Sequence, residues 1–191
     1  MPTPALHEGR VDAAAGDRHL HVVDAATGEI LWEVRLGDGP FVTNNTSGAP
    51  TIADGVVHVG SPSTKTLYAL DLRTGEQLWT HDSGPVKAAP AVVDGLVVYT
   101  TTTGQIGAVE AGSGELVRVQ ELSTDPLAPA GPVIVDDVLL VPGQDGLVHT
   151  MTLDELRGPT VWDVAVPLLL GLVVAGALGA LAARVLRRRR A

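Results

Sequence analysis

Short runs of alternating apolar and polar residues, separated by turn sequences, fill most of residues 1–160. Around Leu67 and Ala69 the chain alternates as a strand does, residues 71–75 have turn composition, and the strand pattern resumes at residues 77–80. Asp71 can accept hydrogen bonds from backbone N–H groups further along, and Gly75 can adopt a positive φ without a steric penalty. The pattern therefore predicts an antiparallel hairpin, and Trp79 adds a large apolar side chain near its end.

The same hairpin turn recurs along the chain. Residues 24–32 repeat residues 71–79 at every fixed position, including the eight-residue step from Asp to Trp. Residues 110–114 keep the turn, but Arg118 stands where Trp would be, and residues 154–162 form a weaker fourth copy that ends at Trp162. We expect the two intact tryptophans, Trp32 and Trp79, to be clamped between neighbouring sheets. The predicted structural docking motif consists of Asp24, Thr27, Gly28, Trp32, Asp71, Thr74, Gly75 and Trp79.

A second repeated segment precedes each of these turns. Residues 50–57, 90–97 and 132–139 align, with prolines at positions 50, 90 and 132 that fall 40 and 42 residues apart. Residues 4–11 are a fainter version of the same segment. An Asp-Gly pair between two apolar runs predicts a tight hairpin, so each unit is expected to have four short strands. Four strands in roughly 40 to 45 residues are typical of a propeller blade.

These motifs resemble the pyrroloquinoline-quinone-like (PQQ-like) β-propeller repeat family, whose pattern is Ala-x-Asp-x-x-Thr-Gly-x-x-x-Trp. The resemblance covers residues 3–162 and is best at residues 69–79. It implies an all-β fold of PQQ-like propeller blades. The family includes quinoprotein dehydrogenases, outer-membrane assembly lipoproteins and repeat proteins without a cofactor, so the resemblance implies a fold more firmly than an activity.

The expected domain organisation is a repeat domain, a helix and a tail. The repeat domain at residues 3–160 has four four-stranded blades at about residues 3–36, 49–81, 89–120 and 131–162. Because propellers of this family usually have seven or eight blades, four blades describe a partial propeller. A transmembrane helix at residues 164–186 and a basic tail at residues 187–191 are expected to follow.

The transmembrane prediction rests on a run of twenty residues, 164–183, that has no charged side chain. At about 1.5 Å per residue a helix of this length matches the hydrocarbon core of a bilayer. Five arginines follow the run, and basic residues favour the cytoplasmic side of a membrane. The sequence therefore predicts a single-pass protein of the cell membrane, with its repeats outside and its C-terminus in the cytoplasm.

Two further hypotheses concern this segment. Gly171, Ala175, Gly179 and Ala183 recur every four residues, which places small side chains along one stripe and suggests a homodimer through the transmembrane helix. Residues 1–20 contain no apolar run typical of a signal peptide. Two interpretations stay open: the chain is part of a longer protein, or the helix is a tail anchor that leaves the repeats in the cytoplasm.

Charge and composition exclude some functions. The formal net charge is −9, and residues 1–160 carry 8 Lys+Arg against 21 Asp+Glu. An acidic repeat domain does not favour nucleic acid as a partner. The chain has no cysteine, so it can form neither a disulfide nor a thiolate site.

No residue is assigned a catalytic, cofactor-binding or metal-binding role. His19 and His21 lie two apart on an expected strand and so face the same side, but spacing places no third metal ligand beside them. His58, His81 and His149 are scattered singly, and Asp54, Asp94 and Asp136 are explained by hairpin turns.

The function expected from the sequence is a non-catalytic, membrane-anchored repeat module that binds or scaffolds proteins on the outer face of a membrane. Its partners are the membrane and either another protein or further propeller blades. Two alternatives stay open. The first is the C-terminal fragment of a PQQ-dependent dehydrogenase, for which the resemblance implies PQQ with calcium. The second is a tail-anchored cytoplasmic sensor domain.

Overall fold

The computed structural model describes residues 3–14, 18–37, 48–127 and 130–158. The chain divides into two compact units, Met1–Leu156 and Arg157–Ala191, and only residues 157 and 158 of the second unit are described. The predicted transmembrane helix, the basic tail, Trp162 and the small-residue stripe all lie outside the described residues.

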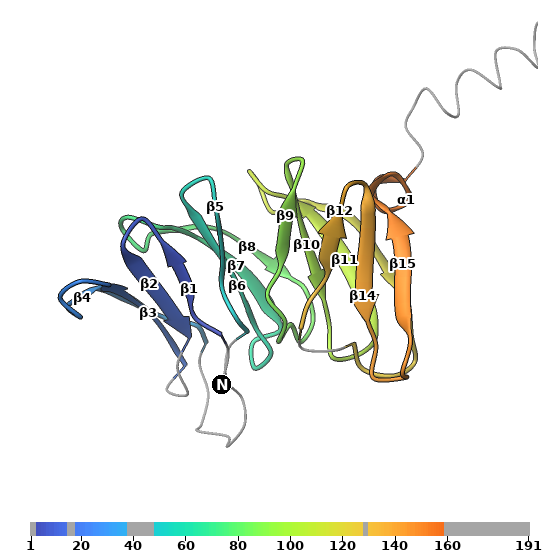
Figure 1. Ribbon diagram of the computed structural model, residues 1–191, viewed down its shortest axis with the longest axis horizontal. Helices are drawn as coiled ribbons and strands as arrows, with labels where there is room; N and C mark the ends of the chain where they lie inside the picture. Colours follow the sequence, from blue (N-terminus) through green and yellow to red (C-terminus); the bar gives the residue numbers. More distant parts are fainter. Residues whose placement is uncertain (1–2, 15–17, 38–47, 128–129, 159–191) are drawn as a thin grey trace, which may run out of the picture. The chain divides into compact units, whose positions relative to one another are not determined.

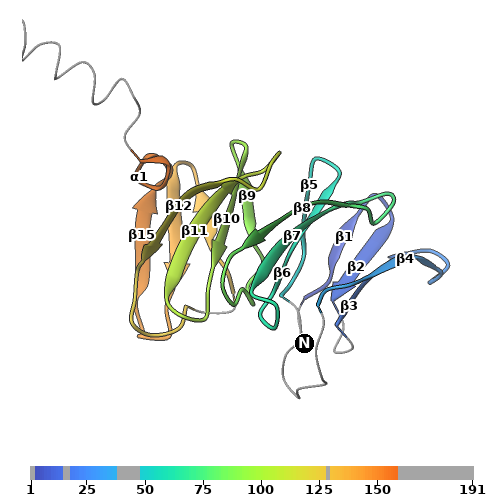
Figure 2. The same cartoon turned by 180° about the vertical axis from the view of Figure 1, so that it is seen from behind.

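The first unit consists of four antiparallel sheets that stand side by side in chain order (Figures 1 and 2). Strands pair in sequence order within every sheet, so each sheet is a meander. The first sheet contains β1 (Ala5–His7), β2 (Arg10–Ala14), β3 (His19–Asp24) and β4 (Ile30–Arg35). The second contains β5 (Thr51–Ala53), β6 (Val56–Ser61), β7 (Thr66–Asp71) and β8 (Gln77–Asp82). The third contains β9 (Ala91–Val93), β10 (Leu96–Thr100), β11 (Gln105–Glu110) and β12 (Leu116–Glu121).

Tight turns join the first two strands of each sheet. Asp54 and Asp94 have φ angles of 50° and 46°, and the glycines after them, Gly55 and Gly95, both have φ of 75°. Two consecutive positive φ angles are typical of a type I′ turn, which matches the twist of the flanking strands. The Asp-Gly signal in the sequence therefore corresponds to local hairpins in the structure.

The fourth sheet differs from the predicted four-stranded unit. Within the described residues it has three strands, β13 (Val133–Val135), β14 (Val138–Pro142) and β15 (Val148–Thr152), and then helix α1 (Leu153–Arg157). The turn that the sequence places at Asp154 is part of this helix. The backbone N–H of Thr152 donates to Glu155 Oε2 at 2.8 Å, and the N–H of Glu155 donates to Thr152 Oγ1 at 3.2 Å. This reciprocal capping box starts a helix directly after β15.

Three apolar clusters hold neighbouring sheets together. Leu20 and Trp32 of the first sheet pack with Val57 of the second, and Trp79 of the second packs with Tyr99 of the third. The remaining cluster lies between the third and fourth sheets, and α1 contributes Leu153 and Leu156 to it. Each of the two middle sheets therefore buries one face against the sheet before it and the other against the sheet after it.

Candidate functional site

The docking motif forms the same turn in the first and second sheets. Asp71 Oδ1 accepts hydrogen bonds from the backbone N–H groups of Arg73 and Thr74, at 2.9 and 2.7 Å, and from the Thr74 hydroxyl at 2.9 Å. These bonds, led by the one from the Thr74 hydroxyl, lower the pKa of Asp71. Asp24 accepts the corresponding bonds from Ala26 and Thr27, and its pKa is lowered chiefly by the bond from the backbone N–H of Thr27. An ionised carboxylate thus organises each turn.

Each motif tryptophan reaches from its own sheet to the turn of the next sheet. The Trp32 indole N–H donates to the carbonyl of Leu72 at 2.9 Å, and a Cβ atom on Gly75 would lie 2.8 Å from the Trp32 ring. The Trp79 indole N–H donates to the carbonyl of Ala111 at 2.8 Å, and a Cβ on Gly114 would lie 2.6 Å from its ring. The turn glycine is therefore also the surface on which the preceding tryptophan lies.

The third sheet has no tryptophan at this position. Arg118 stands there and donates from Nε to Gln120 Oε1 at 3.1 Å, within its own strand. Leu156 of α1 is fully buried in the cluster that joins the third and fourth sheets. The helix thus adds to the apolar contact that strand residues of these two sheets already make.

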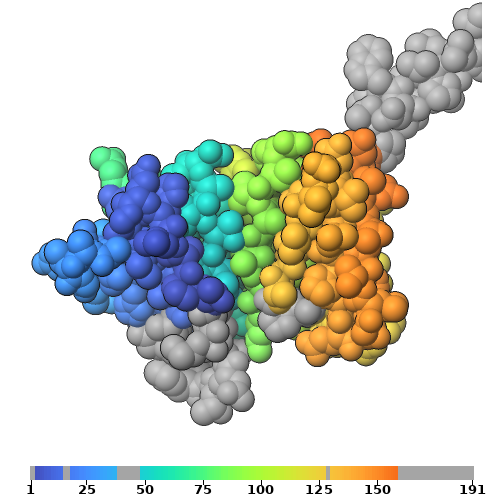
Figure 3. All heavy atoms as spheres, in the orientation of Figure 1, coloured from blue at the N-terminus to red at the C-terminus, as the bar shows by residue number. Residues whose placement is uncertain are grey.

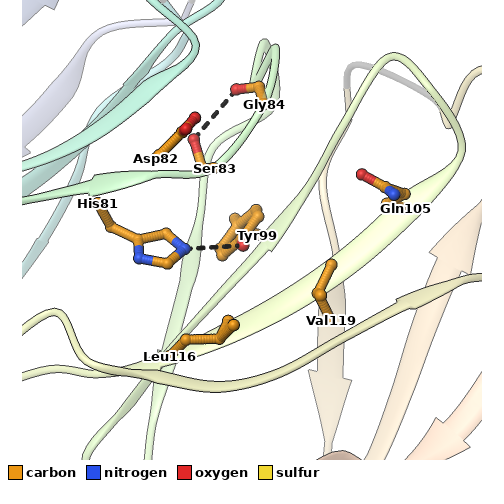
Figure 4. Close-up of a pocket in the computed structure, with 8 residues that line it drawn as sticks. All are labelled: His81, Asp82, Ser83, Gly84, Tyr99, Gln105, Leu116 and Val119. Atoms are coloured by element: carbon orange, nitrogen blue, oxygen red, sulfur yellow. Dashed lines mark hydrogen bonds between the residues drawn. The ribbon is translucent and has the colours of Figure 1, made fainter.

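A cavity lies between the outer strands of the second and third sheets (Figure 4). Its volume is about 220 Å³, and its lining residues are His81, Asp82, Ser83, Gly84, Tyr99, Gln105, Leu116 and Val119. His81 Nε2 and the Tyr99 hydroxyl share a hydrogen bond of 3.2 Å, with the two rings tilted by 52°. Burial raises the pKa of Tyr99 to about 12 and lowers the pKa of His81. A protonated phenol and a neutral imidazole offer hydrogen bonds rather than charge.

Two buried ionisable side chains were not recognised from the sequence. Asp12 and His58 each stand three residues after a turn glycine, and Asp12 is 0% and His58 2% exposed. Neither Asp12 oxygen nor His58 Nδ1 has a hydrogen-bond partner among the described residues. Burial raises the pKa of Asp12 to about 6 and lowers the pKa of His58 to about 4. Alignment of the units was the one sequence signal for their burial. The position equivalent to Asp12 and His58 in the third sheet is Val98, an apolar residue that is fully buried.

A Ser-Asp-His group that links the segment after β12 to the fourth sheet does not have the geometry of a nucleophilic triad. Asp145 Oδ2 accepts from the Ser123 hydroxyl at 2.9 Å and lies 2.9 Å from His149 Nε2. The carboxylate thus lies between serine and histidine, whereas a nucleophilic serine must bond directly to the imidazole. Asp145 also accepts the N–H of Leu147, the main cause of its lowered pKa. The group closes a turn.

His19 and His21 share one face of β3, with ring centroids 5.8 Å apart, and His21 Nδ1 lies 3.3 Å from Glu33 Oε2. Within residues 3–14, 18–37, 48–127 and 130–158, no group of three or more His, Cys, Asp or Glu side chains is placed to hold a metal ion.

Consecutive antiparallel meanders that pack face to face, each linked to the next through a repeated turn, define a β-propeller repeat protein. The chain belongs to the PQQ-like repeat family whose model is described as outer membrane protein assembly factor BamB, and which matches residues 1–89 and 63–178. The resemblance deduced from the motifs is confirmed.

Three known proteins show the range of this similarity. The outer membrane protein assembly factor BamB of Burkholderia pseudomallei is 30% identical over 191 residues, which cover 90% of this chain and 48% of that protein. The crystal structure of BamB from Moraxella catarrhalis matches with a TM-score of 0.66 at 23% identity, over 83% of this chain and 48% of that one. The quinohemoprotein alcohol dehydrogenase of Comamonas testosteroni is 33% identical over 86 residues, 42% of this chain and 12% of the enzyme. The chain spans less than half the length of each.

The location predicted from the sequence is wrong. The relatives that match most of the chain are outer membrane protein assembly factors, which conflicts with a single-pass protein of the cell membrane that has a cytoplasmic C-terminus. In the part of the chain that the structure describes, no helix is sufficiently long and apolar to cross a bilayer. Flanking arginines indicate which end of a transmembrane helix faces the cytoplasm, but they do not indicate which membrane the protein belongs to. The apolar run at residues 164–183 therefore could not establish the location.

Proposed function

We propose that the chain is a non-catalytic repeat module that binds another protein, and that β12 and the neighbouring cavity form its binding surface. The observation that carries this proposal is the exposure of large apolar side chains at the cavity. Leu116 is 53% exposed and Val119 is also exposed, and both side chains line the cavity beside Tyr99 (Figure 4). Exposed apolar side chains grouped at a hollow are typical of a surface that a partner covers.

The position of β12 favours an extended segment as the ligand. β12 is the last strand of its sheet, so one of its edges has no strand partner among the described residues. Such an edge offers N–H and C=O groups to an added strand, while pockets beside it select side chains. We therefore take the partner to be a protein with an extended apolar segment, one side chain of which enters the cavity and contacts the His81–Tyr99 pair. The name of the relatives, assembly factor, agrees with a role in binding other proteins.

In this function the docking motif residues hold the units at residues 3–36, 49–81 and 89–120 together and do not contact the partner. Binding at β12 does not require the apolar run at residues 164–183, which lies outside the described residues.

Photocrosslinking in the producing cell tests the surface. A photoreactive phenylalanine derivative at position 119 is expected to give a covalent adduct with one other protein, identified by mass spectrometry. Leu116→Asp should abolish that adduct, because a carboxylate would be buried against the partner's apolar segment. Ile30→Asp is the matched control, since Ile30 holds the corresponding exposed position on β4 and is 56% exposed. Adducts that survive Leu116→Asp would contradict the proposal.

The alternative of a PQQ-dependent dehydrogenase fragment rests on the similarity to the quinohemoprotein alcohol dehydrogenase. The chain mixed with PQQ and calcium is expected to show neither a change in quinone absorbance nor dye-linked oxidation of alcohols or sugars. Tight binding with turnover would favour the dehydrogenase instead.

A further inference from the structure

The four sheets stand in a row, and each of the two end sheets has an outer face. In the other sheets the equivalent face is buried against a neighbouring sheet. We call the face of a sheet that packs on the preceding sheet its leading face, and the face that packs on the following sheet its trailing face. The first and fourth sheets lie at opposite ends of the row (Figure 3). The leading face of the first sheet and the trailing face of the fourth therefore have no neighbouring sheet among the described residues.

The trailing face of the fourth sheet is apolar and exposed. Val133, Val135, Val138 and Val148 share this face by strand register, and Val133 is 52% and Val148 62% exposed. In the third sheet the counterparts of Val135 and Val138 are Val93 and Leu96, and both pack in the cluster shared with the fourth sheet. An apolar face of this kind is costly in water and indicates a surface that another protein surface covers.

The leading face of the first sheet is also exposed where the equivalent faces of the other sheets are buried. Leu6 is 71% exposed, whereas its counterparts Ile52, Val92 and Ile134 all pack in the clusters with their preceding sheets. The turn glycines point to the same conclusion. Gly28 has no atom within 4 Å of an added Cβ, but Gly75 and Gly114 each support the tryptophan ring of the preceding sheet. The first sheet thus presents an unoccupied form of the surface that the second and third sheets use.

We infer that the trailing face of the fourth sheet in one copy of this chain packs on the leading face of the first sheet in a second copy. The contact repeats the geometry of the three internal interfaces, so it needs no new kind of packing. It is a head-to-tail contact, which closes into a ring when the rotation between copies permits. A second copy is the partner that fits this contact, because every chain carries both of the faces that its own sheets use at their internal interfaces.

An internal contact shows which residues should meet across the new interface. β5 lies beside β9, where the Thr51 hydroxyl donates to the carbonyl of Pro90 at 2.6 Å. The counterparts of these residues at the two ends of the row are Val133 and Pro4. Because the chain has no cysteine, these two positions can be labelled without removing any native thiol.

Disulfide crosslinking of the full chain in mild detergent tests the contact. A mixture of the single variants Pro4→Cys and Val133→Cys should oxidise to a covalent dimer that joins one copy of each. Either variant alone should give much less dimer, because a head-to-tail contact does not bring two copies of one position together. A mixture of Leu78→Cys and Val133→Cys is the control for random collision. Efficient dimers from Val133→Cys alone, or equal yields from the control, would overturn the inference.

Sedimentation of the uncrosslinked chain provides the second measurement. Val148→Lys should weaken association by about tenfold or more, because it places a charge in an apolar interface. Leu78→Lys replaces an exposed leucine on β8, away from the two end faces, and should leave association unchanged. A chain that stays monomeric, or a dimer that both lysine variants leave intact, would overturn the inference. Neither outcome bears on the crosslink at position 119, so failure here is distinguishable from failure of the proposed binding function.

Discussion

Trp79→Ala is expected to lower the free energy of unfolding of the repeats by about 3–5 kcal/mol, which is a large part of a typical domain's stability of about 5–15 kcal/mol. The Trp79 side chain is buried between the second and third sheets and packs with Tyr99 and Val97. Its loss would leave a cavity there and would also leave the carbonyl of Ala111 without the indole donor. Denaturant unfolding of the full chain in mild detergent measures the change, with Trp79→Phe expected to lose less.

The glycine that faces this tryptophan gives an independent check. Gly114→Ala combines a non-glycine residue at φ of 73° with a Cβ atom that would overlap the Trp79 ring. Gly55→Ala is the matched control, because its φ is 75° but nothing lies within 4 Å of the added Cβ. The control should cost about 1 kcal/mol, and Gly114→Ala about 1–3 kcal/mol more, since the ring must move. A Trp79→Ala midpoint equal to wild type, or equal costs for both glycines, would contradict docking of the sheets through this pair.

The repeated architecture could be predicted because its signals are local. The Asp-Gly turns, the Asp-x-x-Thr-Gly turns and the alternating runs each depend on neighbours within a few residues. The helix at Leu153–Arg157 carried a local signal too, the Thr152 to Glu155 capping box, but repeat alignment favoured a turn at Asp154 instead. The error shows that a degenerate repeat copy is better interpreted from its own capping residues than from its better-preserved relatives.

The cavity and the buried ionisable residues could not be predicted from local sequence patterns, because they depend on how sheets pack. His81 and Tyr99 are 18 residues apart and lie on different sheets, and only inter-sheet packing brings them within 3.2 Å. Asp12 has no signal in its own neighbourhood, where it reads as an ordinary polar residue of a strand. Its burial follows from the second sheet, which covers the face that Asp12 shares with Val22 and Trp32.

Asp12 and His58 should affect stability in opposite directions between about pH 4 and pH 6.5. The pKa of Asp12 rises from 3.8 to about 6 on folding, so the folded state holds the proton more tightly and stability falls as the pH rises towards 6. The pKa of His58 falls from 6.5 to about 4, so the unfolded state holds the proton more tightly and stability falls as the pH decreases towards 4. At about 1.4 kcal/mol per pH unit, each effect amounts to about 3 kcal/mol.

Because the two effects oppose each other, the wild-type chain should show a shallow pH dependence, and single substitutions should reveal each component. Asp12→Asn should leave a chain that loses stability on acidification, by up to about 3 kcal/mol more than wild type. His58→Gln should leave a chain that gains stability on acidification by a similar amount. The slopes are the relevant readout, since each substitution also shifts stability by an amount that does not depend on pH.

Denaturant unfolding at several values from about pH 4.5 to about pH 7 measures both slopes, and this range lies above most of the titration of the carboxylates whose pKa is lowered. Asp24, Asp71, Asp145 and Glu155 have lowered pKa values, so the stability that they contribute is lost mainly as the pH falls past their ordinary values, 3.8 for the aspartates and 4.5 for Glu155, and all four are present in every variant. His81 also has a lowered pKa and acts in the same direction as His58, but it is present in every variant and cancels in the comparison. The double variant is the control and should return to a slope near that of wild type. Parallel slopes for the two single variants would show that neither buried group titrates differently in the folded and unfolded chain.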